Sequence, residues 1–269
     1  MARGLLSLAA PLLAMGVVSH AGSSATDTAV RYVANAGMLV TVDGHDLLID
    51  APIRQGIPPY PTSAPDERRR LESAAPPYDR VEAILITHWH ADHFSAEAIA
   101  AHLSANQRAT VISSPEVIAR IRLAGPLLTP SRLRESLPVP GQADLTRVGD
   151  LPIRVLRIRH NPTRRPPAQH VGFLIGDRST VLHVGDADPA ADNFALLTTL
   201  PRVDVALLPY WYVLTDDSRR FVAASIAPRR IVAMHLPVAE TDTLTAALRN
   251  TSLRVSLPGT AGHVVDLTR

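Results

Sequence analysis

The sequence predicts an α/β fold in which short buried strands alternate with capped helices. The clearest strand covers residues 81–86, a short apolar run with several β-branched side chains. A helix is predicted over residues 96–103, because Ser95 has a hydroxyl suited to the N-cap position. A second helix is predicted over residues 115–121, where proline occupies the first helical position.

The same order of elements occurs in two halves of the chain, which is the second observation behind the predicted fold. Residues 47–52 correspond to residues 181–189, residues 81–89 to residues 203–211, and residues 108–114 to residues 229–235. Two more helices are predicted, over residues 217–224 and 241–249. Few residues are identical between the halves, so this interpretation depends on the order and pattern of the elements. It predicts a single domain over residues 26–269, built from a duplicated unit.

Seven consecutive residues carry most of the functional information. They read Thr87-His88-Trp89-His90-Ala91-Asp92-His93 and directly follow the strand over residues 81–86. One strand-end loop thus presents three imidazoles and a carboxylate, the donor types that first-row divalent metals prefer. As core filling, each of these polar groups would need a buried partner. The loop therefore predicts a metal site, and the alternative is a histidine-rich surface loop.

Three further polar residues each follow an apolar strand, as a site at a sheet edge requires. They are His160 after residues 153–159, Asp186 within residues 181–186, and His235 after residues 231–234. One loop cannot enclose two metals, so these residues are the candidates for the remaining ligands.

The motif and the later His, Gly-Asp and His positions resemble the metallo-β-lactamase superfamily, whose signature is HxHxDH. The resemblance implies an αββα sandwich of two mixed β-sheets flanked by helices, with the metals along one shared edge. It also implies a ligand set in which His88, His90 and His160 bind one metal, Asp92, His93 and His235 bind another, and Asp186 bridges the two. In such a centre a hydroxide shared by both metals is the nucleophile, and Asp92 orients it. Zinc fits this set best, and manganese or iron are alternatives.

His170 is the rival of His160, since both lie between the motif and Asp186. We favour His160, because it closes a strand whereas His170 begins one, over residues 171–175; His170 is then expected to line the substrate pocket. Asp50 ends the strand at residues 47–49 and is a natural partner for a metal-bound histidine, although a turn cap is the alternative. His183 is interpreted as a packed residue.

Aromatic side chains cluster at two of these strand ends. Trp89 lies inside the motif, and Tyr210, Trp211 and Tyr212 follow the strand over residues 203–208. We expect Trp89, Tyr210 and Trp211 to contact the substrate, with simple edge packing as the alternative. A proline-rich insertion over residues 50–81 either forms part of the pocket rim or is an exposed linker.

Residues 1–25 have the features of a signal peptide: Arg3, an apolar stretch over residues 5–18, and small residues up to Ala21 or Ala25. The apolar stretch is too short to cross a bilayer comfortably, so no stable membrane insertion is expected after cleavage. We therefore predict a periplasmic or secreted protein. The absence of cysteine excludes a disulfide or a lipidation site.

The charge is nearly balanced, with a formal net charge of +2, and every basic residue is arginine. Nucleic acid is therefore not an expected partner, and a small molecule is. The runs at residues 68–70 and 164–165 are interpreted as solvated, although the second could receive an anionic substrate group. The sequence does not specify an oligomeric state.

The resemblance implies an exported hydrolase of an ester, lactone or phosphodiester, closest to the L-ascorbate 6-phosphate lactonase-like branch. The absence of cysteine excludes the β-lactamase subclass with an Asp-Cys-His site. Hydrolysis of β-lactams remains an alternative, and so does a non-catalytic metal-binding protein on the same fold. The complete ligand set argues against the latter.

Overall fold

The computed structural model describes residues 28–163, 167–259, 262–265, and the single residues 1 and 267. It confirms the α/β prediction. The first sheet has the order β1 (Thr28–Ala34), β2 (Gly37–Val42), β3 (His45–Ile49), β4 (Ala83–Ile86), β5 (Thr110–Ser113) and β6 (Leu133–Glu135). The second has the order β13 (Val255–Ser256), β12 (Arg230–Met234), β11 (Val205–Pro209), β10 (Val181–His183), β9 (Gly172–Ile175), β8 (Leu151–Leu156) and β7 (Ala143–Val148).

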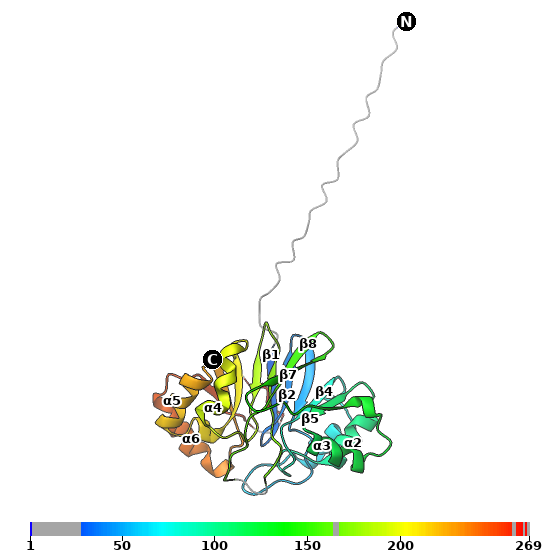
Figure 1. Ribbon diagram of the computed structural model, residues 1–269, viewed down its shortest axis with the longest axis horizontal. Helices are drawn as coiled ribbons and strands as arrows, with labels where there is room; N and C mark the ends of the chain where they lie inside the picture. The colour runs from blue at the N-terminus through cyan, green and yellow to red at the C-terminus, as the bar shows by residue number, and fades with distance from the viewer. Residues whose placement is uncertain (2–27, 164–166, 260–261, 266, 268–269) are drawn as a thin grey trace.

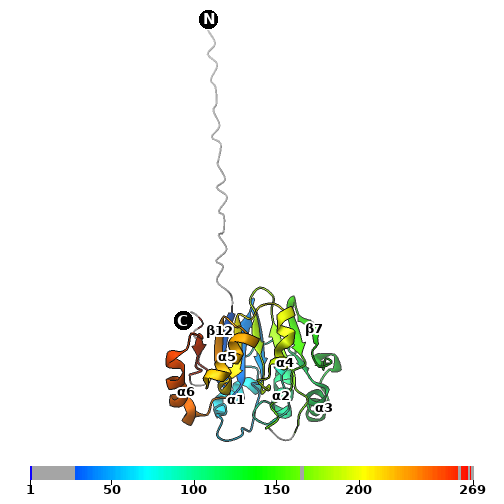
Figure 2. The same ribbon diagram turned by 60° about the vertical axis from the view of Figure 1, so that its left-hand side comes forward.

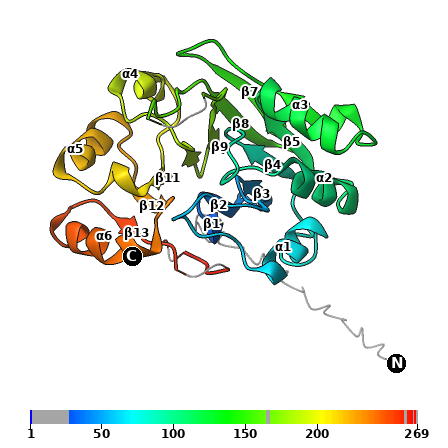
Figure 3. The ribbon, with the colours of Figure 1, turned by 90° about the horizontal axis from the view of Figure 1, so that it is seen from below.

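Helices cover the outer faces of both sheets, so the molecule has four layers (Figure 1). On the side of the first sheet lie α1 (Pro65–Glu72), α2 (Ala96–Ala105) and α3 (Pro115–Ala124), as the view in Figure 3 shows. On the side of the second sheet lie α4 (Ala191–Phe194), α5 (Asp216–Ser225) and α6 (Thr241–Ala247), which Figure 2 brings forward. This is the predicted αββα sandwich of two mixed sheets flanked by helices.

The two sheets repeat one topology. In the first, β1, β2 and β3 pair antiparallel and β3, β4, β5 and β6 pair parallel. In the second, β7 to β10 pair antiparallel and β10 to β13 pair parallel. The strands β3, β4 and β5 thus correspond to β10, β11 and β12. These are the correspondences inferred from the sequence, so the duplicated order is confirmed.

Strand β4 and residues 47–49 of β3 are apolar because both of their faces are buried. Leu47 and Ile49 of β3 point into the core shared by the two sheets, whereas Leu48 packs among the residues of α1, α2 and α3. In β4, Leu85 faces the shared core and Ile84 the helices. Parallel strands covered on both sides lose the alternating pattern of a half-exposed strand.

Two strands that lead to predicted ligands end earlier than the sequence-based expectation. The strand expected to continue to Arg159 ends at Leu156, and His160 lies in the following loop, where it forms an isolated bridge with Ala187. The strand expected over residues 181–186 ends at His183. Beyond these strand ends the two segments meet at the sheet edge, where the Asn161 amide donates to the Asp186 carbonyl oxygen at 2.8 Å. The proline-rich insertion contains the unexpected helix α1, whose Arg69 and Arg70 pair with acidic residues one turn earlier.

Among the described residues, no helix has the length and apolar character needed to cross a membrane.

Candidate metal centre

Asp50 connects the ends of two neighbouring parallel strands. It follows β3, and Thr87 follows β4, so the two residues lie side by side at the same sheet edge. The Asp50 carboxylate accepts hydrogen bonds from the Thr87 amide (2.8 Å) and the Thr87 hydroxyl (2.6 Å). It also accepts one from His93 Nδ1, at 2.8 Å. Asp50 is therefore the partner of a motif histidine that the sequence suggested, and it fixes His93 with Nε2 pointing away from Asp50.

Two other histidines are oriented in the same way. His88 Nδ1 lies 3.0 Å from the Thr87 hydroxyl oxygen, and His160 Nδ1 donates to the Asn161 carbonyl oxygen at 2.8 Å. With the proton on Nδ1, the lone pair is on Nε2. The Nε2 atoms of His88 and His160 are buried, and no described residue offers either of them a hydrogen bond. A buried lone pair without a donor is unfavourable unless a cation is bound there.

The predicted ligands converge into adjoining groups of donor atoms. Within each group the donor atoms lie within 4.8 Å of one another. The groups are His88, His90 and His160; Asp92, His93 and His235; and His88, His93 and Asp186. The donors are imidazole and carboxylate groups, which fits divalent metals of the zinc, manganese or iron type.

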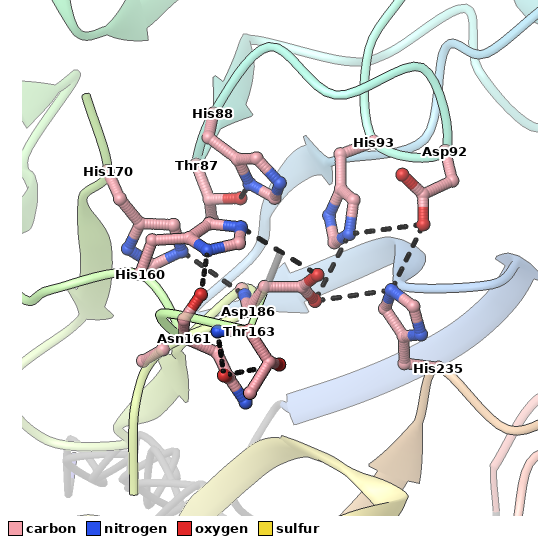
Figure 4. Close-up of polar contacts among 12 residues, drawn as sticks. Thr87, His88, Asp92, His93, His160, Asn161, Thr163, His170, Asp186 and His235 are labelled. Atoms are coloured by element: carbon pink, nitrogen blue, oxygen red, sulfur yellow. Dashed lines mark hydrogen bonds and ion pairs between the residues drawn. The ribbon is translucent and has the colours of Figure 1, made fainter. Parts of the chain in front are cut away.

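The Asp186 carboxylate lies between the first two groups (Figure 4). Its Oδ1 is 3.2 Å from Nε2 of both His93 and His235, and its Oδ2 is 3.9 Å from His160 Nε2. Asp92 completes the second group, with its Oδ2 at 3.1 Å from His235 Nε2. The structure therefore brings all seven predicted ligand side chains together at one edge.

Gly185 permits the turn that places Asp186. Its φ is +55°, in the left-handed region. A Cβ atom at this position would lie 2.6 Å from the Thr87 hydroxyl oxygen and 2.7 Å from His170 Nε2. A side chain larger than hydrogen would therefore force Asp186 away from the motif loop.

His170 is buried beside this turn and both of its ring nitrogens are engaged. Nδ1 donates to the Ile158 carbonyl oxygen at 3.1 Å, and Nε2 accepts from the Asp186 amide at 3.1 Å. Its ring is 5.3 Å from that of His160, so the rivals are neighbours. The geometry supports His160 as the donor to a metal and gives His170 the task of holding the Asp186 backbone. The expected contact of His170 with substrate stays a prediction.

Asn35 is a site residue that sequence reasoning missed. It lies in the turn between β1 and β2 with a φ of 47°. Its Nδ2 donates to the Asp92 carbonyl (3.1 Å) and to Asp92 Oδ2 (3.3 Å), and its carbonyl accepts from the His235 amide at 3.1 Å. One asparagine thus positions two ligands. An asparagine in a hairpin turn gives no functional signal of its own, because turns favour this residue anyway.

The proline-rich insertion reaches the site. The ring of Tyr60 meets the ring of His235 edge to face, with centroids 4.0 Å apart. Trp211 packs on His235 as well, at 5.2 Å, and Tyr210 lies 5.6 Å from Trp211. The insertion is therefore part of the rim, the first of the two alternatives. Tyr60 was missed because it lies in a segment without periodicity.

The predicted aromatic contacts divide between two sides of the centre. Trp89 lies beside His90, with ring centroids 5.1 Å apart, and the Arg120 guanidinium covers its ring at 4.5 Å. Trp211 lies beside His235 on the other side, and Tyr210 packs on Trp211. Their roles in substrate binding stay predictions. Tyr212 is buried in the core, where its hydroxyl donates to the Ala187 carbonyl at 2.8 Å.

Burial and neighbouring charges shift the pKa values of the site residues. Burial, followed by the neighbouring His93 and His170, lowers the pKa of His88 well below its usual value. Burial also lowers the pKa of His160. Burial would raise the pKa of Asp186, but His235 and His93 hold it well below its usual range. Burial would lower the pKa of His93, but Asp186 and Asp92 raise it well above its usual value. Neutral His88 and His160 and an ionised Asp186 are already in the forms that bind metals, whereas His93 has to release a proton when a metal binds.

His183 is a packed residue, as interpreted from the sequence: its Nε2 lies 3.0 Å from the Ala36 carbonyl oxygen and its Nδ1 accepts from the Gly185 amide. The arginine pair at residues 164–165 and the predicted signal peptide at residues 1–25 lie outside the described residues, apart from Met1.

The profile of the family described as a beta-lactamase superfamily domain matches residues 45–255, most of the chain. The chain belongs to the metallo-β-lactamase superfamily. This membership confirms the predicted fold and the prediction of a metal-dependent hydrolase of that superfamily. The chain is 26% identical over 223 residues to a UPF0173 metal-dependent hydrolase from Hyperthermus butylicus, a match that covers 79% of this chain and 86% of the relative.

Solved structures of the superfamily share the architecture. Igni18, a metallo hydrolase from Ignicoccus hospitalis, has a TM-score of 0.60 and 18% identity, over 88% of this chain and 97% of that one. An isothiocyanate hydrolase from Delia radicum gut bacteria has a TM-score of 0.60 and 18% identity, over 89% and 98%. At this level of identity the likeness establishes the fold alone.

Proposed function

We propose that this protein is an exported hydrolase with two metal ions, which cleaves an ester, lactone or phosphodiester. The observation that carries the proposal is the position of Asp186 between two groups of three donors. Its two carboxylate oxygens face different groups, Oδ1 towards His93 and His235 and Oδ2 towards His160. A carboxylate in this position suits a bridging ligand.

The first metal would be held by His88, His90 and His160, and the second by Asp92, His93 and His235. Zinc suits the histidine-rich set, and manganese and iron also suit the carboxylates. When bound, a pair of divalent ions would supply Lewis acidity and lower the pKa of water towards neutrality.

Within this site Asp92 is the proposed catalytic residue. Burial would raise its pKa, but His93 and His235 lower it to about 2, so Asp92 is ionised at neutral pH. An ionised carboxylate accepts a hydrogen bond and can hold a nucleophilic water in place. Asn35 keeps Oδ2 of Asp92 in position through its amide group, at 3.3 Å.

The L-ascorbate 6-phosphate lactonase-like branch remains our proposal for the nearest functional group. Its support is the Asp50-Ala51-Pro52 turn after β3, within a family match that spans residues 45–255. A lactone or another small ester is accordingly the substrate class to test first.

Metal analysis combined with a substrate panel tests the proposal. After loading with zinc or manganese, the purified protein should contain close to two equivalents and cleave at least one of an ester, a lactone and bis-p-nitrophenyl phosphate. Nitrocefin in the same panel tests β-lactam hydrolysis. Asp186→Ala should lose metal and turnover together. A stable value of one equivalent with both metals would overturn the two-metal centre.

Export has a separate test, because it depends only on the leader. Mass spectrometry of the protein from its native host should find an N-terminus after Ala21 or Ala25 and the protein in the periplasm or medium. An intact Met1 in the membrane fraction would overturn the proposal of export.

A further inference from the structure

A cavity of about 620 Å³ adjoins the metal centre on the side of His160. Its volume falls in the range of small-molecule pockets. Its walls are mainly apolar and include Leu156, Ile158, Phe194 and Leu196. His160 is shared by the cavity and the centre, since its ring lines the cavity while its Nε2 lies 3.9 Å from Asp186 Oδ2. A substrate cleaved at the centre can therefore extend past His160 into this cavity.

Among the described residues, three charged side chains line the cavity, and two of them neutralise each other. Arg159 makes two hydrogen bonds to the Asp192 carboxylate, both at 2.9 Å. The third, Arg157, is half-buried. Its Nη1 is buried without an acceptor, and no carboxylate among the described residues forms an ion pair with it. In the part of the cavity that the structure describes, apolar walls thus surround one positive charge without a carboxylate partner.

A partly buried guanidinium without a partner is costly, and an anion of planar geometry is its natural complement. Arg157 precedes His160 by three residues, so their Cα atoms are at most about 11 Å apart. Both residues line the same cavity, so a substrate held beside His160 lies in the cavity that Arg157 also lines.

We propose that the cavity binds the acyl part of the substrate and that Arg157 pairs with a carboxylate at the end of that acyl chain. The substrate class is then an ester or lactone with an apolar body and a terminal carboxylate. This inference rests on the proposed function, because it takes the bond cleaved to lie at the metal centre.

Two esters of equal length test the pairing. They are mono-4-nitrophenyl adipate, which ends in a carboxylate, and 4-nitrophenyl hexanoate, which ends in a methyl group. Hydrogen bonds to charged groups predict that the metal-loaded wild type favours the adipate ester by about 10- to 100-fold in kcat/KM. Arg157→Gln should abolish this preference by lowering kcat/KM for the adipate ester.

Arg159→Gln is the matched control, because Arg159 lines the same cavity but already has a carboxylate partner. This variant should keep the preference for adipate. If the preference is lost in Arg159→Gln and kept in Arg157→Gln, or is absent from the wild type, the assignment to Arg157 is wrong.

A binding measurement separates this inference from the proposed function. Adipic acid monoanilide and hexananilide carry the same two chains on an amide, and their affinities can be measured by calorimetry. The monoanilide should bind the wild type more tightly, and Arg157→Gln should remove the difference, whether or not any ester is cleaved. Equal affinities for the wild type would overturn the anion site, while cleavage of both esters at equal rates would leave the hydrolase proposal standing.

Discussion

Asp50 and His93 form a buried hydrogen bond of 2.8 Å between the end of β3 and the motif loop after β4. The bond presents the Nε2 of His93 to the metal centre, and the same carboxylate holds Thr87 through two further bonds. Asp50, which lies outside the motif, therefore orients His93 and Thr87.

Asp50→Ala should weaken metal binding by about 10- to 100-fold, the usual effect of removing a partner of a metal-bound histidine. It should also lower the free energy of unfolding by about 1–3 kcal/mol, because buried groups of Thr87 lose their acceptor. Titration with a competing chelator measures the first effect and chemical denaturation the second. The matched control is Asp46→Asn, at the other end of β3, where the carboxylate binds Thr41 and Arg80 instead. Wild-type metal affinity in Asp50→Ala would contradict the role of Asp50.

The neighbours His160 and His170 should respond differently to substitution. His160→Ala removes a proposed ligand, so metal content should fall and nearly all activity should be lost. His170→Ala should keep its metal. Its free energy of unfolding should fall by about 1–3 kcal/mol for each buried main-chain group that is left without a partner. Elemental analysis and thermal unfolding of both variants distinguish the two roles. Loss of a metal in His170→Ala with full occupancy in His160→Ala would reverse the assignment.

Gly185→Ala should displace Asp186, since the new methyl group would lie 2.6 Å from the Thr87 hydroxyl oxygen. We expect a loss of stability of about 1–3 kcal/mol together with reduced metal occupancy. Gly44→Ala is the control for backbone strain alone. Gly44 also has a positive φ, but a methyl group there would meet no described residue within 4 Å apart from its chain neighbours. Both effects are read from denaturation and metal analysis. Normal occupancy in Gly185→Ala would show that the turn tolerates a side chain.

His45 should make stability depend on pH at the end of the sandwich away from the metals. Burial lowers its pKa, but hydrogen bonds to Glu82 and Asp150 outweigh burial, so the pKa is raised above 6.5. The stabilisation is therefore complete below the unfolded pKa and is lost as the pH rises through the higher folded pKa. The difference in melting temperature between wild type and His45→Gln should be larger at pH 5.5 than at pH 8.5. High salt should reduce this difference in melting temperature, since Asp150 is exposed. A difference independent of pH would contradict this.

Six of the seven proposed ligands could be found from the sequence because they lie in the motif or close to the end of a strand of a parallel pair, and parallel strands end at the same edge. Asp50 could be found for the same reason. His160 was found because the alternating residues before it resemble a strand that ends there. Asn35 and Tyr60 could not, since their contacts depend on how a hairpin turn and a proline-rich segment pack against His235. The loop carrying His160 was expected to be strand because its residues alternate in polarity, and the pattern does not reveal that the pairing stops at Leu156.

The donors come from both repeats of the duplicated unit: the motif from the first, and Asp186 and His235 from the second. A bound ion would thus connect the two repeats through its ligands. By mass action, an ion that binds only when both repeats are assembled shifts the folding equilibrium by RT ln(1 + [metal]/Kd). Depletion of metal would then have a second effect besides the loss of activity. It would loosen the junction between the repeats and expose the chain to proteases, so the amount of protein as well as its activity would follow the supply of metal.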